Sequence, residues 1–239
     1  MLNLIKNYSP NFSTYKRNFK NIKFIIIHYT GMMSENKAIN RLTNVNSKVS
    51  CHYFVKKNGK IILMVPEIYT SWHAGKSKWK KFKSLNKYSI GIEIQNSGHA
   101  NNLENFTTKQ IISLITICKY LKKKYKIKKE NILGHSDISY DRKKDPGEKF
   151  PWKVLAKHKL SIWHNIEKKN LIHKRNIKLS KTETKSFFKS LKKIGYPIQK
   201  NSIKDKKLII CFQRRFRQEL INGIVDKECL IIANKLINI

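Results

Sequence analysis

The first hundred residues carry the short-period apolar patterns of β-strands. Residues 24–27 form a continuous apolar run, which is typical of a buried central strand. Residues 89–95 alternate between apolar and polar positions and predict a strand with one face in the core. Residues 51–56 and 60–65 are rich in strand-forming residues. Asn58-Gly59 between them is the strongest short signal for a hairpin. The pattern therefore predicts several strands in this part of the chain.

Helical spacing occurs between and after these strands. Ser34 precedes apolar residues at helical spacing, which predicts a helix over residues 34–44. Thr107 and Gln110 form a capping box that opens a longer helix with one apolar face and a Lys-rich end. The segments that follow predict a short strand, a polar loop and another helix: residues 131–135, 139–152 and 153–168.

A polar, basic stretch near residues 169–180 precedes a region whose pattern is purely helical. Ser180 and Glu183 form a capping box for the first of three short amphipathic helices. The second carries Leu208 at helical spacing with other apolar residues, and the third begins at Asp226. We therefore predict a larger domain followed by a small three-helix bundle: residues 10–168 and 178–239.

The charge balance is strongly basic. Lysine and arginine number 51 against 15 aspartates and glutamates, which gives a formal net charge of +36. Such a balance raises the question of nucleic acid. Only seven of these residues are arginine, the side chain whose planar fork reads bases and phosphates. We expect no nucleic-acid partner. The charge is explained either by AT-rich codons, which encode the abundant Ile, Asn and Lys, or by attraction to an acidic polymer.

The cysteines and the apolar runs exclude two classes of protein. Cys51, Cys118, Cys211 and Cys229 form no CxxC pair and lie in apolar contexts, which predicts buried free thiols rather than a disulfide framework. No run approaches 18 apolar residues, so we expect no membrane span. The first 23 residues have no apolar core or small-residue cleavage site of a signal peptide, which predicts a cytoplasmic location. We expect a monomer.

Three separated residues form a candidate metal set. His28 directly follows the apolar run 24–27, and His135 follows Ile132-Leu133-Gly134 in the same way. Asp145 lies ten residues further on, in a loop. Two imidazoles and one carboxylate are a known catalytic zinc set, and three protein ligands leave a fourth position for water. We predict one zinc ion, although His28 taken alone could equally be a structural histidine.

Two charged residues are the candidate catalytic groups. Glu93 interrupts an otherwise apolar strand, where an unpaired carboxylate would be costly, so it is expected to point into a site and act as the base. Lys143, two residues before Asp145, supplies a cation for a developing oxyanion.

Six short segments in order resemble the zinc type-2 family of N-acetylmuramoyl-L-alanine amidases, which shares its fold with peptidoglycan recognition proteins. The similarity covers roughly residues 10–165. The segments are Ile25-Ile26-Ile27-His28-Tyr29-Thr30, Val49-Ser50-Cys51-His52-Tyr53, Trp72-His73-Ala74-Gly75, Ile90-Gly91-Ile92-Glu93-Ile94, Gly134-His135-Ser136-Asp137-Ile138 and Lys143-Lys144-Asp145-Pro146-Gly147.

The resemblance implies a fold and a reaction. The fold would be α/β, a mixed central β-sheet flanked by helices, with the small C-terminal bundle attached. The zinc ligands would be His28, His135 and Asp145, with Glu93 as general base and Lys143 as the oxyanion cation. The enzyme would cleave the amide between N-acetylmuramic acid, or its 1,6-anhydro form, and L-alanine in peptidoglycan or muropeptides. A non-catalytic peptidoglycan receptor on the same fold is the alternative.

Five residues in or beside these segments are candidates for substrate binding. We expect His73 and Trp72 in a cleft loop, where His73 contacts substrate or supports a ligand and Trp72 stacks on a sugar or packs. Asn96 would bond a peptide carbonyl or cap a turn, and His52 is as well explained by a structural role. Tyr29, next to His28, completes the set. The remaining histidines are expected at the surface: His99, His158, His164 and His173.

The C-terminal bundle resembles the helical module of a broad-specificity amidase usually found on the outer membrane. That module is similar to peptidoglycan-binding domains, so the bundle would bind cell wall or would pack against the larger domain and stabilise it. Gln213 and the neighbouring arginines could equally form a solvated helix face. This resemblance makes a periplasmic or outer-membrane location the alternative to the cytoplasm.

Overall fold

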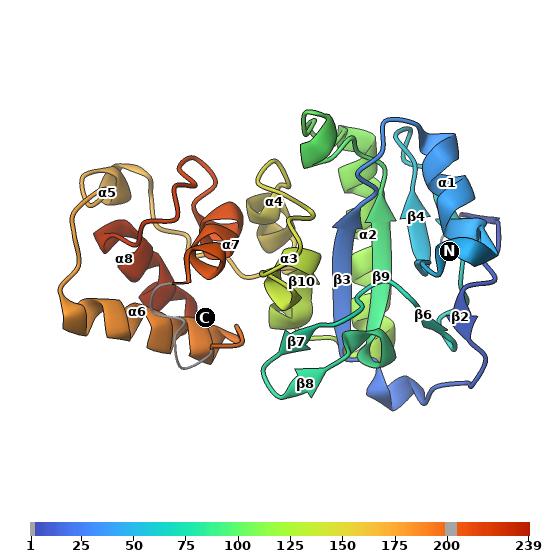
Figure 1. Ribbon diagram of the computed structural model, residues 1–239, viewed down its shortest axis with the longest axis horizontal. Helices are drawn as coiled ribbons and strands as arrows, with labels where there is room; N and C mark the ends of the chain where they lie inside the picture. The colour runs from blue at the N-terminus through green and yellow to red at the C-terminus, as the bar shows by residue number, and fades with distance from the viewer. Residues whose placement is uncertain (1–2, 199–204) are drawn as a thin grey trace.

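A six-stranded mixed sheet organises the larger part of the molecule. The computed structural model describes residues 3–198 and 205–239 (Figure 1). Every pair of neighbouring strands is parallel except the hairpin β4–β5, as the Asn58-Gly59 signal predicts. In spatial order the strands are β1 (Leu4–Lys6), β5 (Ile61–Leu63), β4 (Tyr53–Val55), β9 (Ser89–Ile94), β3 (Phe24–Tyr29) and β10 (Ile132–Gly134). The expected mixed sheet is confirmed.

Short elements connect and flank these strands. Two small antiparallel pairs are β2 (Phe12–Ser13) with β6 (Thr70–Ser71), and β7 (Lys78–Trp79) with β8 (Phe82–Lys83). Short 3₁₀ turns lie at η1 (Phe19–Asn21), η2 (Val45–Ser47), η3 (Leu85–Tyr88), η4 (His99–Asn101) and η5 (Lys129–Asn131). The helices are α1 (Glu35–Thr43), α2 (Thr108–Tyr125), α3 (His135–Ile138), α4 (Trp152–Lys157), α5 (Lys169–Ile172), α6 (Lys181–Ile194), α7 (Lys206–Phe216) and α8 (Lys227–Leu236).

The helix starts follow the capping residues in the sequence. The Ser34 hydroxyl accepts from the backbone of Lys37 at the start of α1. Thr107 with Gln110, and Ser180 with Glu183, form reciprocal capping boxes at α2 and α6. Asp226 caps α8 with its carboxylate alone, which accepts from the Cys229 N–H. These side chains satisfy backbone N–H groups that the helix cannot pair itself.

The predicted helix over 153–168 is too long. Helix α4 ends at Lys157, Lys159 takes a left-handed conformation (φ 58°), and the Leu160 N–H donates back to the carbonyl of Leu155. The chain leaves the helix here because Leu160 and Ile162 are buried against different parts of the core. Two further short helices were not expected: α3, which begins at His135, and α5, within the basic stretch.

The two faces of β3 serve different parts of the core. Ile25 and Ile27 join the apolar cluster that contains the buried face of α2. Phe24 and Ile26 join a second cluster, which also contains the apolar residues of α6, α7 and α8. In Figure 1 the C-terminal helices lie at the side of β10, with α3 and α4 between them and the sheet. His28 continues the face of Phe24 and Ile26 at the end of the strand.

One buried apolar cluster therefore includes both parts of the chain. The division into residues 10–168 and 178–239 stays a prediction, and the two parts share part of their core. Among residues 3–198 and 205–239, no helix combines the length and the apolar character that crossing a bilayer requires.

Candidate metal centre and its cleft

The carboxyl ends of three neighbouring parallel strands place the candidate catalytic residues together. His28 lies near the end of β3, and its register partner on β9 is Glu93. His135 follows the last residue of β10, which pairs with β3 on the other side. Ligand sites in sheets of parallel strands form outside these carboxyl ends. The topology therefore brings side chains from distant parts of the sequence to one edge.

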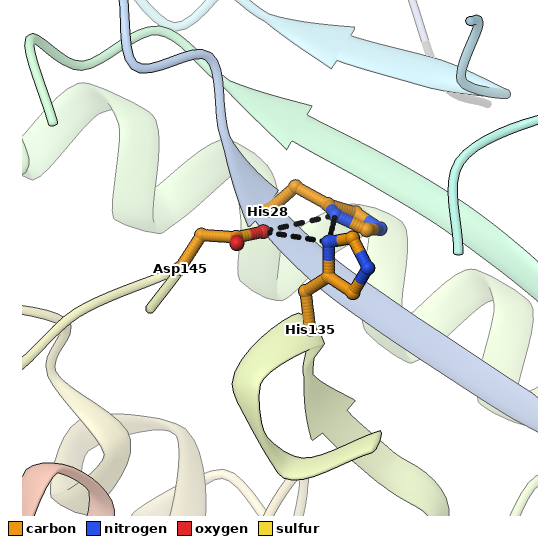
Figure 2. Close-up of side chains that lie close together, drawn as sticks. All are labelled: His28, His135 and Asp145. Atoms are coloured by element: carbon orange, nitrogen blue, oxygen red, sulfur yellow. Dashed lines mark hydrogen bonds and ion pairs between the residues drawn. The ribbon is translucent and has the colours of Figure 1, made fainter. Parts of the chain in front are cut away.

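Three side chains converge at this edge (Figure 2). The Nδ1 atoms of His28 and His135 lie 3.0 Å apart. The Oδ2 atom of Asp145 lies 3.0 Å from His28 Nδ1 and 3.1 Å from His135 Nδ1. All three residues are buried. The structure therefore brings together the three residues that the sequence suggests as metal ligands.

The outer nitrogens of both histidines have acceptors of their own. His135 Nε2 lies 3.1 Å from the carbonyl oxygen of Ala74, so this nitrogen carries the hydrogen and donates. His28 Nε2 lies 3.0 Å from Nδ1 of His73. The Ser89 hydroxyl donates to the Leu85 carbonyl and lies 3.1 Å from His73 Nε2.

The single hydroxyl hydrogen of Ser89 fixes the direction of the hydrogen bonds that run from His28 through His73 to Ser89. Because it is used toward Leu85, Ser89 accepts from His73 Nε2–H. Nδ1 of His73 is then a bare acceptor, and the His28 Nε2–H donates to it. Both ligand histidines therefore turn unprotonated Nδ1 atoms toward Asp145.

This arrangement fits a metal cation. Two bare nitrogens and a carboxylate oxygen about 3 Å apart repel one another unless a cation lies among them. Tetrahedral zinc with bonds of about 2.0–2.1 Å keeps its ligand atoms about 3.3 Å from one another, close to the spacing here.

The protonation states agree with metal binding. Burial lowers the pKa of His28 to about 4, which leaves the imidazole neutral at neutral pH. Burial opposes ionisation of Asp145, but His135 and His28, when protonated, hold the pKa of that carboxyl well below its usual range, and a metal cation in their place would act in the same direction. Metal ligands must be deprotonated in this way.

The segment Trp72–Gly75 supports both ligand histidines. His73 accepts from His28, and the carbonyl of Ala74 accepts from His135. Arg142 donates to the same carbonyl at 2.6 Å and so fixes its position. Such outer hydrogen bonds set the tautomer and orientation of a ligand histidine. The sequence marks this segment by its motif, but a backbone carbonyl leaves no residue-type signal.

Two glycines permit the close approach that the site needs. A Cβ atom at Gly91 would lie 2.4 Å from the ring of His73, which covers β9 at this point. A Cβ atom at Gly134 would lie 2.6 Å from the ring of Pro146, next to Asp145. Both contacts are shorter than real side chains allow, so glycine is required where β9 passes His73 and where β10 passes Pro146.

Glu93 lines the cavity beside the candidate metal ligands. One of its carboxylate oxygens is buried and makes no hydrogen bond to any described residue. Burial and the nearby Asp145 raise the pKa of Glu93 well above its usual value, while Lys143 and Arg41 act in the opposite direction. Glu93, Lys143 and Arg41 all line the same cavity as the metal ligands. A buried polar atom without a partner is costly, which favours a functional role.

The cavity over the metal centre measures about 630 Å³. Of the predicted substrate-binding residues, Tyr29, Trp72 and His73 line it. His99 lines it too and bonds the Tyr29 hydroxyl at 2.8 Å, so its expected surface position is wrong. The size suits a ligand of several hundred daltons.

His52 and Asn96 lie outside the lining of this cavity. Nδ1 of His52 accepts from the Gly91 N–H at 3.0 Å and from the Ser71 hydroxyl, and the whole residue is buried. The Asn96 amide donates to the Glu104 carbonyl, and its oxygen accepts from the Gly98 N–H. These contacts match the structural alternatives for both residues, and a contact of either with substrate stays a prediction.

Comparison with known proteins gives a consistent family. Residues 18–148 match the model of a family described as N-acetylmuramoyl-L-alanine amidase. The chain is 34% identical over 233 residues to N-acetylmuramoyl-L-alanine amidase AmiD of Escherichia coli, covering 92% of this chain and 83% of that protein. It is 40% identical over 106 residues to 1,6-anhydro-N-acetylmuramyl-L-alanine amidase AmpD of Haemophilus influenzae, covering 44% and 55%.

Solved structures extend the similarity to the whole chain. The complex of the E. coli amidase AmiD with anhydro-N-acetylmuramic acid-L-Ala-D-gamma-Glu-L-Lys superposes with a TM-score of 0.80 at 33% identity, covering 95% of this chain and 91% of that one. AmpDh3 of Pseudomonas aeruginosa gives 0.78 at 26% identity, covering 99% and 98%. The similarity therefore includes the C-terminal helices.

Proposed function

The chain belongs to the N-acetylmuramoyl-L-alanine amidase family, and we propose that it is a zinc hydrolase with His28, His135 and Asp145 as the metal ligands. The convergence of these three side chains is the observation that carries the proposal. The reaction is cleavage of the amide between N-acetylmuramic acid and L-alanine in peptidoglycan fragments.

The 1,6-anhydro sugar is a substrate form that two relatives support. One solved relative holds an anhydro-N-acetylmuramic acid tripeptide, and another similar protein is named for the 1,6-anhydro substrate. The stem peptide carries carboxylates. Four cationic side chains line the cavity and offer them a complementary charge: Arg41, Arg142, Lys143 and Lys144.

The bound zinc would supply a Lewis acid that polarises the amide carbonyl and lowers the pKa of water. Glu93 takes a proton from the attacking water, whose oxygen forms a bond to the carbonyl carbon. The Lys143 ammonium group stabilises the charge on the carbonyl oxygen. Glu93 then returns the proton to the alanine nitrogen as the carbon–nitrogen bond breaks. The products are the muramic acid carboxylate and a stem peptide with a free amino terminus.

The raised pKa of Glu93 serves both halves of this cycle. An ordinary glutamate is a weak base toward water and holds a proton poorly for a leaving amine. Burial shifts its pKa upward, toward the range in which one group both accepts and donates a proton. A non-catalytic receptor would not need a half-buried glutamate with one buried, unpaired oxygen beside a metal set.

The test is Glu93→Gln in the full chain, with zinc content and muropeptide cleavage measured on the same sample. We expect one zinc per chain and a loss of turnover of about 10²–10⁴-fold, the range of general acid–base catalysis. Glu104→Gln is the matched control, because Glu104 binds Lys57 and the Ser97 backbone and does not line the cavity. Normal turnover in Glu93→Gln would remove Glu93 from the mechanism.

A further inference from the structure

The C-terminal bundle reaches into the catalytic part at one buried carboxylate, Asp137. Arg215 of α7 forms an ion pair with Asp137 Oδ2 through Nη1, and the Tyr196 hydroxyl donates to Oδ1 at 2.7 Å. Asp137, Tyr196 and Arg215 are at most 3% exposed. In Figure 1, α7 is the bundle helix that faces α3 and α4.

Asp137 belongs to the turn that carries a metal ligand. Its Oδ2 atom accepts from the backbone N–H of Gly134 at 2.7 Å, so it bridges the residues on either side of His135. The position of His135 therefore depends on where this carboxylate is held. The bundle supplies two of the groups that hold it, and both come from beyond residue 178.

Further contacts tie α7 to the same turn. Nη2 of Arg215 donates to the Ile132 carbonyl in β10 at 3.2 Å, and its guanidinium stacks over Trp152 with 4.2 Å to the ring centroid. Cys211, one helical turn earlier, donates from Sγ to the Ser136 carbonyl at 3.2 Å. Helix α7 thus contacts the backbone on both sides of His135.

Arginine at position 215 makes contacts that lysine could not make together. The chain uses lysine for most of its positive charge and has only seven arginines. A lysine ammonium could pair with Asp137, but it could not also lie flat on Trp152 and reach the Ile132 carbonyl. The planar fork makes these contacts at once.

We propose that Arg215 and Tyr196 are positioning residues for the metal ligand His135, and that the C-terminal bundle is in this way part of the metal site. The inference rests on the zinc assignment above. A buried ion pair adds little net stability by itself, but its geometry fixes the groups that it joins. The bundle therefore acts on the metal through Asp137 and the turn at His135.

The experiment compares two pairs of matched variants in the full chain. Tyr196→Phe removes the hydroxyl that binds Asp137, and Tyr53→Phe removes an equally buried hydroxyl that donates to Glu67. Arg215→Lys replaces the guanidinium fork at Asp137 with a single ammonium group. Arg217→Lys does the same to an equally buried arginine that pairs with Asp226 inside the bundle.

Zinc affinity is measured for each variant by competition with a chromophoric chelator, with thermal unfolding recorded alongside. We expect zinc affinity to fall about tenfold in Tyr196→Phe and Arg215→Lys, the lower end of the range for groups that orient metal ligands. Excess zinc should restore their turnover. The controls should unfold at similarly lowered temperatures and keep the affinity of the unaltered protein.

The outcomes separate this inference from the proposed function. If the unaltered protein binds no zinc at these ligands, the proposed function fails and this inference fails with it. If the unaltered protein binds zinc and all four variants keep that affinity, only this inference is overturned. If Arg215→Lys does not fold, the isosteric Tyr196→Phe decides by itself.

Discussion

The central sheet meets two helical layers that hold it by different means. Helix α2 packs on it mainly through apolar side chains, with Leu114, Ile117 and Leu121 against the isoleucines of β9, and its polar contacts there are neutral hydrogen bonds such as that from Gln110 to the Gln95 carbonyl. The bundle shares an apolar cluster with the sheet but adds buried or half-buried charges at the boundary, where Arg215 meets Asp137 and Arg214 meets Glu148. Apolar packing is non-directional, whereas hydrogen-bonded charges fix individual atoms.

The proposed metal site lies on the face of the sheet that shares a cluster with the bundle. Along β9, Ile90, Ile92 and Ile94 face α2, while Gly91 and Glu93 face the metal centre. The strand thus carries core residues on one face and candidate site residues on the other. The layer of α2 should accordingly govern stability, and the opposite side should govern metal affinity and turnover.

Among the substitutions that separate the roles of the two layers, Leu114→Ala is expected to have the largest effect on stability. Leu114 is fully buried, so the substitution leaves a cavity beneath the sheet. We expect the free energy of unfolding to fall by about 2–5 kcal/mol, measured by denaturant titration. Zinc affinity and turnover of the folded protein should not change. A tenfold loss of zinc affinity would show that the two layers are not separate in function.

The second effect is acid sensitivity of the bundle side, where His164 is buried at the junction. It was expected at the surface, but it lies beside Phe216 and Arg217 and accepts from the Ile166 N–H through Nδ1. Burial lowers its pKa to about 4. An unfolded histidine has a pKa of about 6.5, so the unfolded chain binds the extra proton between these values.

Stability should therefore fall as the pH drops from about 6.5 to about 4, by about 3 kcal/mol from this group. The variant His164→Asn keeps an acceptor near the Nδ1 position and cannot be protonated. Denaturant titrations at several pH values should show a shallower acid decline for this variant. His158→Asn is the control, because His158 is exposed. If the unaltered protein and both variants lost stability equally on acidification, His164 would not be the source of the acid sensitivity.

Local sequence patterns predict features such as helix caps, but they do not predict contacts between residues far apart in the chain. The caps at Thr107 and Ser180 depend on residues three positions away and were foreseen. The end of α4 at Lys157 depends on where Leu160 is buried, and the local sequence pattern does not predict that position. Arg215 was a candidate for a solvated helix face, but its partner lies 78 residues away and it is buried.

The candidate site shows the same difference between local signals and distant contacts. His28, His135 and Asp145 are recognisable because each lies at the end of a strand or in a loop with a distinctive motif, and the structure brings them together. The supporting groups are harder to find. The carbonyl of Ala74 has no side-chain signature, and the direction of the His73 hydrogen bonds follows only from the geometry at Ser89.

The smallest expected effect concerns His73. It tests whether hydrogen bonds, rather than packing, position the residues on the metal side of the sheet. His73→Leu removes the acceptor for the His28 Nε2–H and lets that ring rotate or change tautomer. We expect zinc affinity to fall about tenfold, or about 1.4 kcal/mol, measured by chelator competition.

A graded series isolates the hydrogen bond from the loss of the ring. His73→Asn places an oxygen acceptor near the former Nδ1 and should recover most of the zinc affinity. Ser89→Ala leaves the His73 ring in place but removes the group that selects its tautomer, so its affinity should lie between those of His73→Leu and the unaltered protein. If His73→Asn bound zinc no better than His73→Leu, the side chain would act by filling space above Gly91. Packing would then govern this side of the sheet as it governs the side of α2.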